Sequence, residues 1–162
     1  MNIFYLDNDV KECAASHMDK HVVKMILEYS QLLSTAHRVL DGQEMFIKRE
    51  YISELGDKQY RNIKTWKIND ERDDCLFKAS HINHPSAIWV RQSICNYEWL
   101  LDLLAALHEE YTFRYEKFHA SYNLIAPFLI EPDNIPHCSF APPPQCMPDQ
   151  YKMDNTIDAY RK

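Results

Sequence analysis

Apolar side chains recur at helical spacing in two long stretches of the chain. Five in the first stretch stand three or four residues apart: Ile26, Tyr29, Leu33, Ala36 and Leu40. This spacing places them on one face of a helix. Asp9, followed three residues later by Glu12, is a typical helix start, and Gly42 is a typical helix end. We therefore expect helical structure between Asp9 and Gly42, with a break near Met18.

The second stretch follows the pair His84-Pro85. Proline suits the first turn of a helix, so we expect one helix, or a broken pair of helices, over residues 86–117. Six residues form its apolar face: Tyr97, Leu100, Leu101, Leu104, Leu107 and Tyr111. Shorter helices are expected at 121–130 and at 154–162, where Asp154 serves as the cap.

The other segments lack a helical pattern. Residues 2–6 are a short apolar run, which suits a strand or a tucked-in arm. Residues 43–74 are polar and charged, and we expect a surface excursion with at most short helices. Seven of the eight prolines lie between 127 and 148, so residues 131–150 are expected to be extended coil. These patterns predict a single all-α domain over residues 1–162, with an N-terminal arm.

Charge limits the possible partners. The chain has 162 residues, with 18 Lys and Arg against 24 Asp and Glu, so its formal net charge is -6. Non-specific DNA coating needs an excess of cations, so any nucleic-acid site must be a local basic patch. No apolar run approaches the ~20 residues of a membrane helix, and the N-terminus has no secretory signal pattern. We expect no membrane partner, and the composition leaves the oligomeric state open.

Five cysteines, an odd number with no CxxC pair, suggest free thiols in a reducing compartment. A cytoplasmic location is therefore expected.

A polar stripe accompanies the apolar stripe of the first helix. Its members are spaced 4, 3, 4, 3 and 4 residues apart: His17, His21, Lys24, Glu28, Gln31 and Thr35. Cations beside Glu28 favour its ionised form, which can stabilise a developing cation or move a proton. The same pattern is typical of a solvated helix face. His17 and His21 also have the spacing of a metal-binding pair, which would suit a metal-dependent hydrolase.

Two further segments can contact nucleic acid. Pro85 places Ser86 at a helix start, where anions bind, and Arg91 can clamp a phosphate or form an ion pair. Trp89 can stack on a base, although filling the core is the better interpretation. In residues 58–67, cations alternate with aromatics, which suits nucleic-acid binding. The acidity of the chain instead favours a charged loop whose aromatics dock on the core.

Three parts of the sequence together resemble the small helical pyrimidine-dimer DNA glycosylases of phages and bacteria. Met1–Leu6 is similar to that family's N-terminal arm. Asp19–Glu28, followed by Gln31–Leu33, resembles its helix with a His and, seven residues later, the catalytic Glu. The second half is matched by three pieces: Asn83-His84-Pro85, Arg91 and Glu109–Tyr115. The whole chain also resembles small phage proteins, and if the gene belongs to a phage the expected location is the host cytoplasm.

The resemblance implies a DNA N-glycosylase and lyase that acts on a damaged or modified pyrimidine without a cofactor or a metal. The α-amine of Met1 would attack the sugar, Glu28 would stabilise the cationic sugar, and His21 would position the substrate. Asn2 is not small, so Met1 should be retained. Eight residues are expected to bind substrate: Lys20, Lys24, His84, Ser86, Trp89, Arg91, Asn96 and Arg114. The alternative is a non-catalytic phage-type protein that binds a small nucleotide-like ligand in the same cleft.

Overall fold

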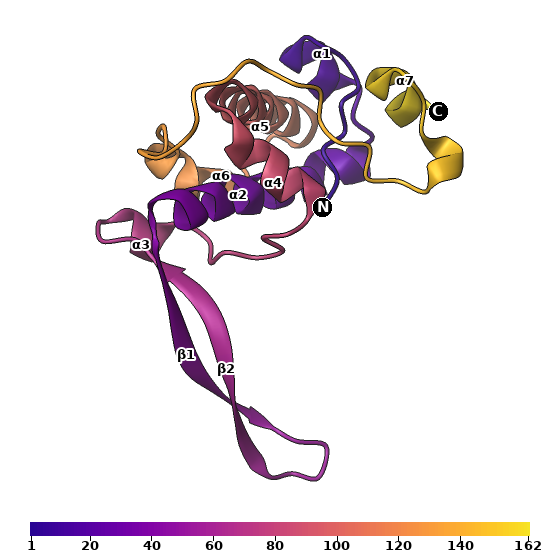
Figure 1. Cartoon of the computed structure of the whole chain (residues 1–162). Helices are drawn as coiled ribbons and strands as arrows, with labels where there is room; N and C mark the ends of the chain where they lie inside the picture. The colour runs from indigo at the N-terminus through magenta and orange to yellow at the C-terminus, as the bar shows by residue number, and fades with distance from the viewer.

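The computed structural model describes all 162 residues as a helical body from which a long hairpin projects (Figure 1). The elements are α1 (Val10–Ala15), α2 (Asp19–Asp41), β1 (Gln43–Ile52), β2 (Lys58–Lys67), α3 (Arg72–Cys75), α4 (Pro85–Gln92), α5 (Ile94–Tyr115), α6 (Ala120–Ile125) and α7 (Thr156–Arg161). Two 3₁₀ turns cover Ala126–Phe128 and Asp149–Tyr151. The all-α prediction is wrong: about half of the residues are helical, and the two strands make the fold mixed α/β.

The hairpin occupies most of the segment expected to be a loop. β1 and β2 are antiparallel and paired over ten positions, from Gln43 opposite Lys67 to Ile52 opposite Lys58. Gly56 adopts a φ of 85° in the turn, a conformation that glycine accepts without strain. Every residue of β1 is exposed. A strand with no buried face needs no apolar–polar alternation, so its sequence gives little periodic signal.

The body is built around α2, α4 and α5, and its core contains the apolar stripes that the sequence predicts. Four of the five stripe residues of α2 are fully buried, and Leu40 is partly buried. The helical stretch is broken before α2, as expected near Met18. Gly42, directly after α2, lies against the last turn of the helix: a Cβ atom on it would lie 2.4 Å from the Arg38 carbonyl oxygen. Only glycine fits this approach.

The predicted helix starts are confirmed at two places and corrected at a third. Asp9 accepts hydrogen bonds from the first turn of α1, and His84 caps α4, with Pro85 as its first residue. The second stretch is a broken pair, because Ser93 caps a new helix, α5. The last helix is capped by Asn155, whose side chain accepts from two backbone N–H groups, and not by Asp154.

The N-terminal segment is a tucked-in arm without strand structure. Ile3, Tyr5 and Leu6 are buried in the body. The backbone N–H of Phe4 donates to the Tyr29 hydroxyl at 3.0 Å, which fixes the arm to α2. The five cysteines form no disulfide, and no helix combines the length and apolarity needed to cross a bilayer.

Candidate functional site

The N-terminal amine lies beside a carboxylate of α2. The Met1 nitrogen is 3.8 Å from Oε2 of Glu28, and Lys24 Nζ is 3.1 Å from Oε1 of the same carboxylate. The Glu28 side chain is 15% exposed and the Lys24 side chain is 70% exposed, so the Lys24–Glu28 ion pair is open to solvent on the side of Lys24. These groups border a hollow of about 180 Å³, here called the Met1 hollow, lined by Met1, Asn2, Phe4, His21, Lys24, Met25 and Glu28.

Two elements position this amine and this carboxylate. On α2, His21, Lys24 and Glu28 follow one another at intervals of three and four residues, which places them on one helix face. The arm is held at its third and fourth residues: Ile3 is fully buried, and the Phe4 carbonyl accepts from the Cys13 thiol at 3.2 Å. The amine is only two residues from these anchors, so the arm restricts its position.

The ring of His21 forms one wall of the Met1 hollow. It stacks on Phe4 with ring centroids 4.3 Å apart and planes 15° apart. A second hollow of about 250 Å³ also borders both rings, and its other lining residues are Leu6, Ser16, Met18, Tyr160 and Arg161. The stacked pair therefore borders both hollows, of which the second has the more apolar lining.

His84 belongs to the same electrostatic environment. Burial lowers its pKa, repulsion from the charged Met1 amine lowers it further, and Glu28 acts in the opposite direction. Figure 1 likewise places the N-terminus beside the start of α4. The lowered pKa favours a neutral imidazole, which can form hydrogen bonds but carries no charge.

The start of α4 offers no free donor at Ser86 to an anion. The Ser86 N–H donates to His84 Nδ1 at 3.2 Å, and Ser86 itself is buried, with its hydroxyl 3.5 Å from the Cys146 sulfur. The expected phosphate contact at Ser86 is therefore not supported, because the protein's own side chains already satisfy this helix start.

Trp89 and Asn96 hold the proline-rich coil in place. The Trp89 indole is buried and donates to the Ala141 carbonyl at 2.8 Å. The Asn96 amide donates to the Trp89 carbonyl at 2.9 Å and accepts from the Ala141 N–H at 3.0 Å. Neither side chain borders the Met1 hollow, and the core interpretation of Trp89 is the one that the structure supports.

The remaining predicted cations lie outside the Met1 hollow. Arg91 donates to the Ala87 carbonyl of its own helix at 2.9 Å, and burial lowers its pKa. Lys20 is exposed in the first turn of α2. Arg114 contacts the carboxylates of Asp19 and Glu110 at 2.8 and 2.6 Å. It also donates to the carbonyls of Ala15 and His17 at the end of α1, so these contacts give Arg114 a structural role.

His17 does not continue the polar stripe, because it precedes α2. It is buried, its Nδ1–H donates to the Cys13 carbonyl at 2.7 Å, and burial lowers its pKa to about 4. The expected pairing with His21 on one helix face is therefore wrong. No three His, Cys, Asp or Glu side chains converge in a way that could hold a metal ion.

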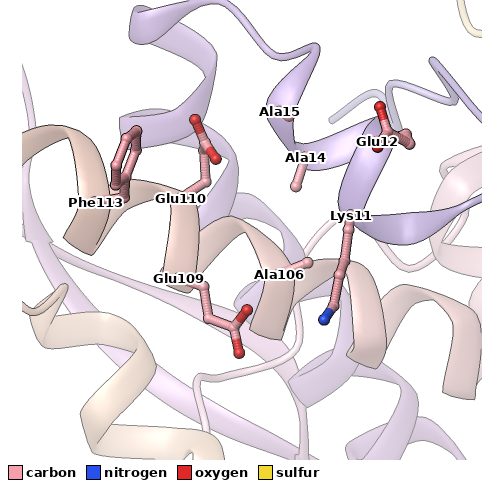
Figure 2. Close-up of a pocket in the computed structure, with 8 residues that line it drawn as sticks. All are labelled: Lys11, Glu12, Ala14, Ala15, Ala106, Glu109, Glu110 and Phe113. Atoms are coloured by element: carbon pink, nitrogen blue, oxygen red, sulfur yellow. The ribbon is translucent and has the colours of Figure 1, made fainter.

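Another hollow, of about 310 Å³, lies between α1 and α5 (Figure 2). Three of its lining residues are acidic, Glu12, Glu109 and Glu110, and Lys11 is its only cation. Glu110 is already paired with Arg114 at 2.6 Å, and Glu109 and Glu110 point in different directions from α5. Its excess of carboxylates disfavours an anionic ligand there, whereas the Met1 hollow places an amine beside a carboxylate and is the candidate site.

Sequence reasoning missed Phe4 and Tyr29 as supports of the site. The helical spacing marks Tyr29 only as a core residue, although its hydroxyl holds the arm. The apolar run of residues 2–6 does not distinguish Phe4 from its neighbours.

No family model, curated protein or solved structure gives a significant match to this chain.

Proposed function

We propose that the chain is a DNA N-glycosylase and lyase that acts on a damaged or modified pyrimidine, with the Met1 amine as nucleophile. One observation carries the proposal: a main-chain amine and a carboxylate, 3.8 Å apart, border the same hollow. An α-amine is less basic than a lysine amine, so more of it is neutral and nucleophilic near pH 7. Glu28, with Oε2 3.8 Å from the Met1 nitrogen, is placed to take a proton from it.

The proposed reaction begins when the neutral amine attacks C1′ of the deoxyribose. The new C1′–N bond forms as the bond to the base breaks, and the base leaves with that electron pair and is protonated. The amine loses a proton to Glu28, Glu28 returns that proton to O4′ as the C1′–O4′ bond breaks and the sugar ring opens, and a protonated imine forms between C1′ and the Met1 nitrogen. Loss of a C2′ proton then expels the 3′ phosphate by β-elimination, which cleaves the strand. His21 lines the hollow where it can orient the sugar.

The size of the Met1 hollow favours part of a larger substrate over a free ligand. Its volume is about 180 Å³, whereas pockets that enclose small molecules usually begin near ~300 Å³. One sugar ring of a DNA chain needs less enclosure, because the rest of the substrate is held elsewhere. This supports DNA as the partner, in place of a free nucleotide. The proposed location is the cytoplasm, where the five free thiols would stay reduced.

Borohydride trapping tests the chemistry, because it reduces an imine to a stable amine and leaves protein and DNA covalently joined. The substrates are duplexes that contain a pyrimidine dimer, a hypermodified pyrimidine or an abasic site. We expect a trapped adduct whose peptide map places the DNA on Met1. Glu28→Gln should slow trapping by about 10²- to 10⁴-fold, the usual range for a lost acid–base group. The control is Glu98→Gln, which makes the same charge change at an exposed position of α5.

A one-residue N-terminal extension provides the complementary test. It keeps a free α-amine but moves it by up to about 3.8 Å, the distance between neighbouring Cα atoms. Trapping should then fall to background, while the helical circular dichroism spectrum stays unchanged. An adduct on a lysine, an extended chain that traps normally, or the absence of an adduct with every substrate contradicts the proposal. Nucleotide binding without any adduct would support the non-catalytic alternative.

A further inference from the structure

The two faces of the hairpin differ in charge. Side chains of opposite residues in an antiparallel pair share a face, so the odd-numbered residues of β1 and β2 form one face and the even-numbered residues form the other. The odd face carries Arg49, Arg61 and Lys67 and contains no carboxylate. The even face carries Glu44 and Glu50 together with its lysines.

Two of the three lysines of the even face are neutralised within the protein, and Lys48 is the one without an ion pair. Lys58 Nζ lies 3.0 Å from a Glu50 oxygen, and Lys64 Nζ lies 2.8 Å from a Glu44 oxygen. On the odd face, Arg49 lies directly opposite Arg61, and neither forms an ion pair within 4.0 Å. Like charges placed opposite each other destabilise a strand pair, and a bound anion would remove that repulsion.

Aromatic and apolar groups surround these two arginines. The Arg61 guanidinium lies over the Tyr51 ring, 5.7 Å from its centroid, and Tyr51 is itself 40% exposed. Met45 and Ile47 on the same face are also exposed. Cations beside exposed aromatic and apolar side chains suit a nucleic acid, which offers phosphates and base edges together. The hairpin reaches away from the helical body, so this face is not covered by the rest of the chain (Figure 1).

We propose that the odd face of the hairpin is a binding surface for duplex DNA, with Arg49 and Arg61 as its central contacts. Residues 43–67 contain six Lys and Arg and four Asp and Glu, a net charge of +2 in a chain whose total is -6. The hairpin therefore has the charge that a polyanion requires, although the whole chain does not.

The dimensions of the hairpin favour duplex DNA. The major groove of B-DNA, about 12 Å wide, admits a two-stranded ribbon. Ten paired residues at about 3.4 Å each span about 34 Å, close to one turn of the duplex. The major groove of duplex RNA is too deep and narrow for such contacts. This surface is separate from the Met1 hollow, and its role does not depend on the proposed chemistry.

The test compares two double variants of the full chain with equal charge changes. Arg49→Gln/Arg61→Gln removes the cations of the odd face, and Lys58→Gln/Lys64→Gln removes the paired cations of the even face. Binding to an undamaged 20-base-pair duplex is followed by fluorescence anisotropy over a range of salt concentrations. We expect the arginine variant to bind about tenfold or more weakly and its salt slope to fall by about two, roughly one for each lost phosphate contact. The lysine variant should change both quantities much less.

Several results would overturn the proposal. These are equal losses in the two variants, unchanged affinity in the arginine variant, no duplex binding by the parent chain, or tighter binding to a single strand of the same length. A change in molecular mass by sedimentation, without a change in DNA affinity, would assign the face to a second copy of the chain. Both arginines are exposed and unpaired, so the fold should persist, and matching thermal unfolding curves check this. Trapping at Met1 is measured separately, so either proposal can fail alone.

Discussion

Arg38 is a fully buried arginine that ties the last turns of α2 to the base of the hairpin and to α3. Its guanidinium donates to the carbonyls of Trp66 and Phe77 at 3.0 and 2.6 Å. It also donates to a side-chain oxygen and the carbonyl of Asp73, at 2.6 and 2.8 Å, and to the Leu76 carbonyl at 2.8 Å. Arg38→Met keeps the aliphatic bulk of the side chain and removes all five of these hydrogen bonds.

The expected cost follows from the groups that remain. Removing one partner of a buried ion pair costs about 3–5 kcal/mol, because the other charge and its neighbours stay unsatisfied. Asp73 is partly exposed and still accepts from the Ile68 N–H at 3.0 Å, which favours the lower end of that range. We therefore expect Arg38→Met to lower the free energy of unfolding by about 3 kcal/mol. In a chain of this size, that corresponds to a Tm lower by about 6–12 °C.

Urea unfolding followed by circular dichroism measures this change. Arg161→Met is the control, because Arg161 also contacts a carbonyl and a carboxylate, on Leu6 and Asp7, at 2.6 and 3.1 Å. Its side chain is 52% exposed, so its loss should cost less than about 1 kcal/mol. The reasoning is refuted if the two variants are equally destabilised, or if Arg38→Met lies within about 1 kcal/mol of the parent chain.

Three further outcomes are expected. Burial lowers the pKa of His17 and His37 to about 4, below the unfolded value of 6.5. The contribution of each neutral histidine to the free energy of unfolding is therefore fully present above pH 6.5 and is lost as the pH falls toward 4. Urea unfolding should show a loss of the order of 2 kcal/mol per histidine between pH 7 and 5, and a smaller loss in His17→Gln. Arg114→Met should reduce stability by about 1–3 kcal/mol without changing the affinity for DNA, because its partners are structural. Asn96→Ala should speed proteolysis within residues 131–150, since it frees the Ala141 backbone; an unchanged cleavage rate would contradict this role.

The helical elements could be predicted because their signals are local. A stripe such as Tyr29 and Leu33 must face a core wherever the helix packs, and a cap such as Asp9 acts within a few residues of itself. The hairpin could not be recognised in this way. Its strands expose both faces over most of their length, and their stability depends on cross-strand pairs 6 to 24 residues apart, which no short periodic pattern reveals.

Part of the candidate site could be predicted, because helix spacing and the position of the arm are also visible in the local sequence. Met1, His21, Lys24 and Glu28 line one hollow, as an arm packed on a helix face allows, although their roles remain proposals. Arg114 has the same chemistry as a phosphate-binding arginine, and only the structure shows that carbonyls at the end of α1 already engage it. A sequence reveals that a donor exists but not whether the fold has already supplied its acceptor.

The net charge of -6 weighs against DNA as a partner. In this chain positive and negative charges lie in different segments, so the local charge of each segment decides whether DNA can bind there. Residues 43–67 carry +2, so the rest of the chain carries -8. The hairpin is about 34 Å long, whereas charges are screened over about 8 Å at physiological ionic strength. A duplex held on the outer part of the hairpin therefore experiences its arginines and little of the acidic body. The Met1 hollow lies in that body, since Glu28 lies 13 residues before the last residue of α2, or about 20 Å from the end of the helix that leads into the hairpin. Under the two proposals, DNA at the hollow would lie beside a body of net negative charge, and the hairpin would supply the attraction that the net charge of the body does not.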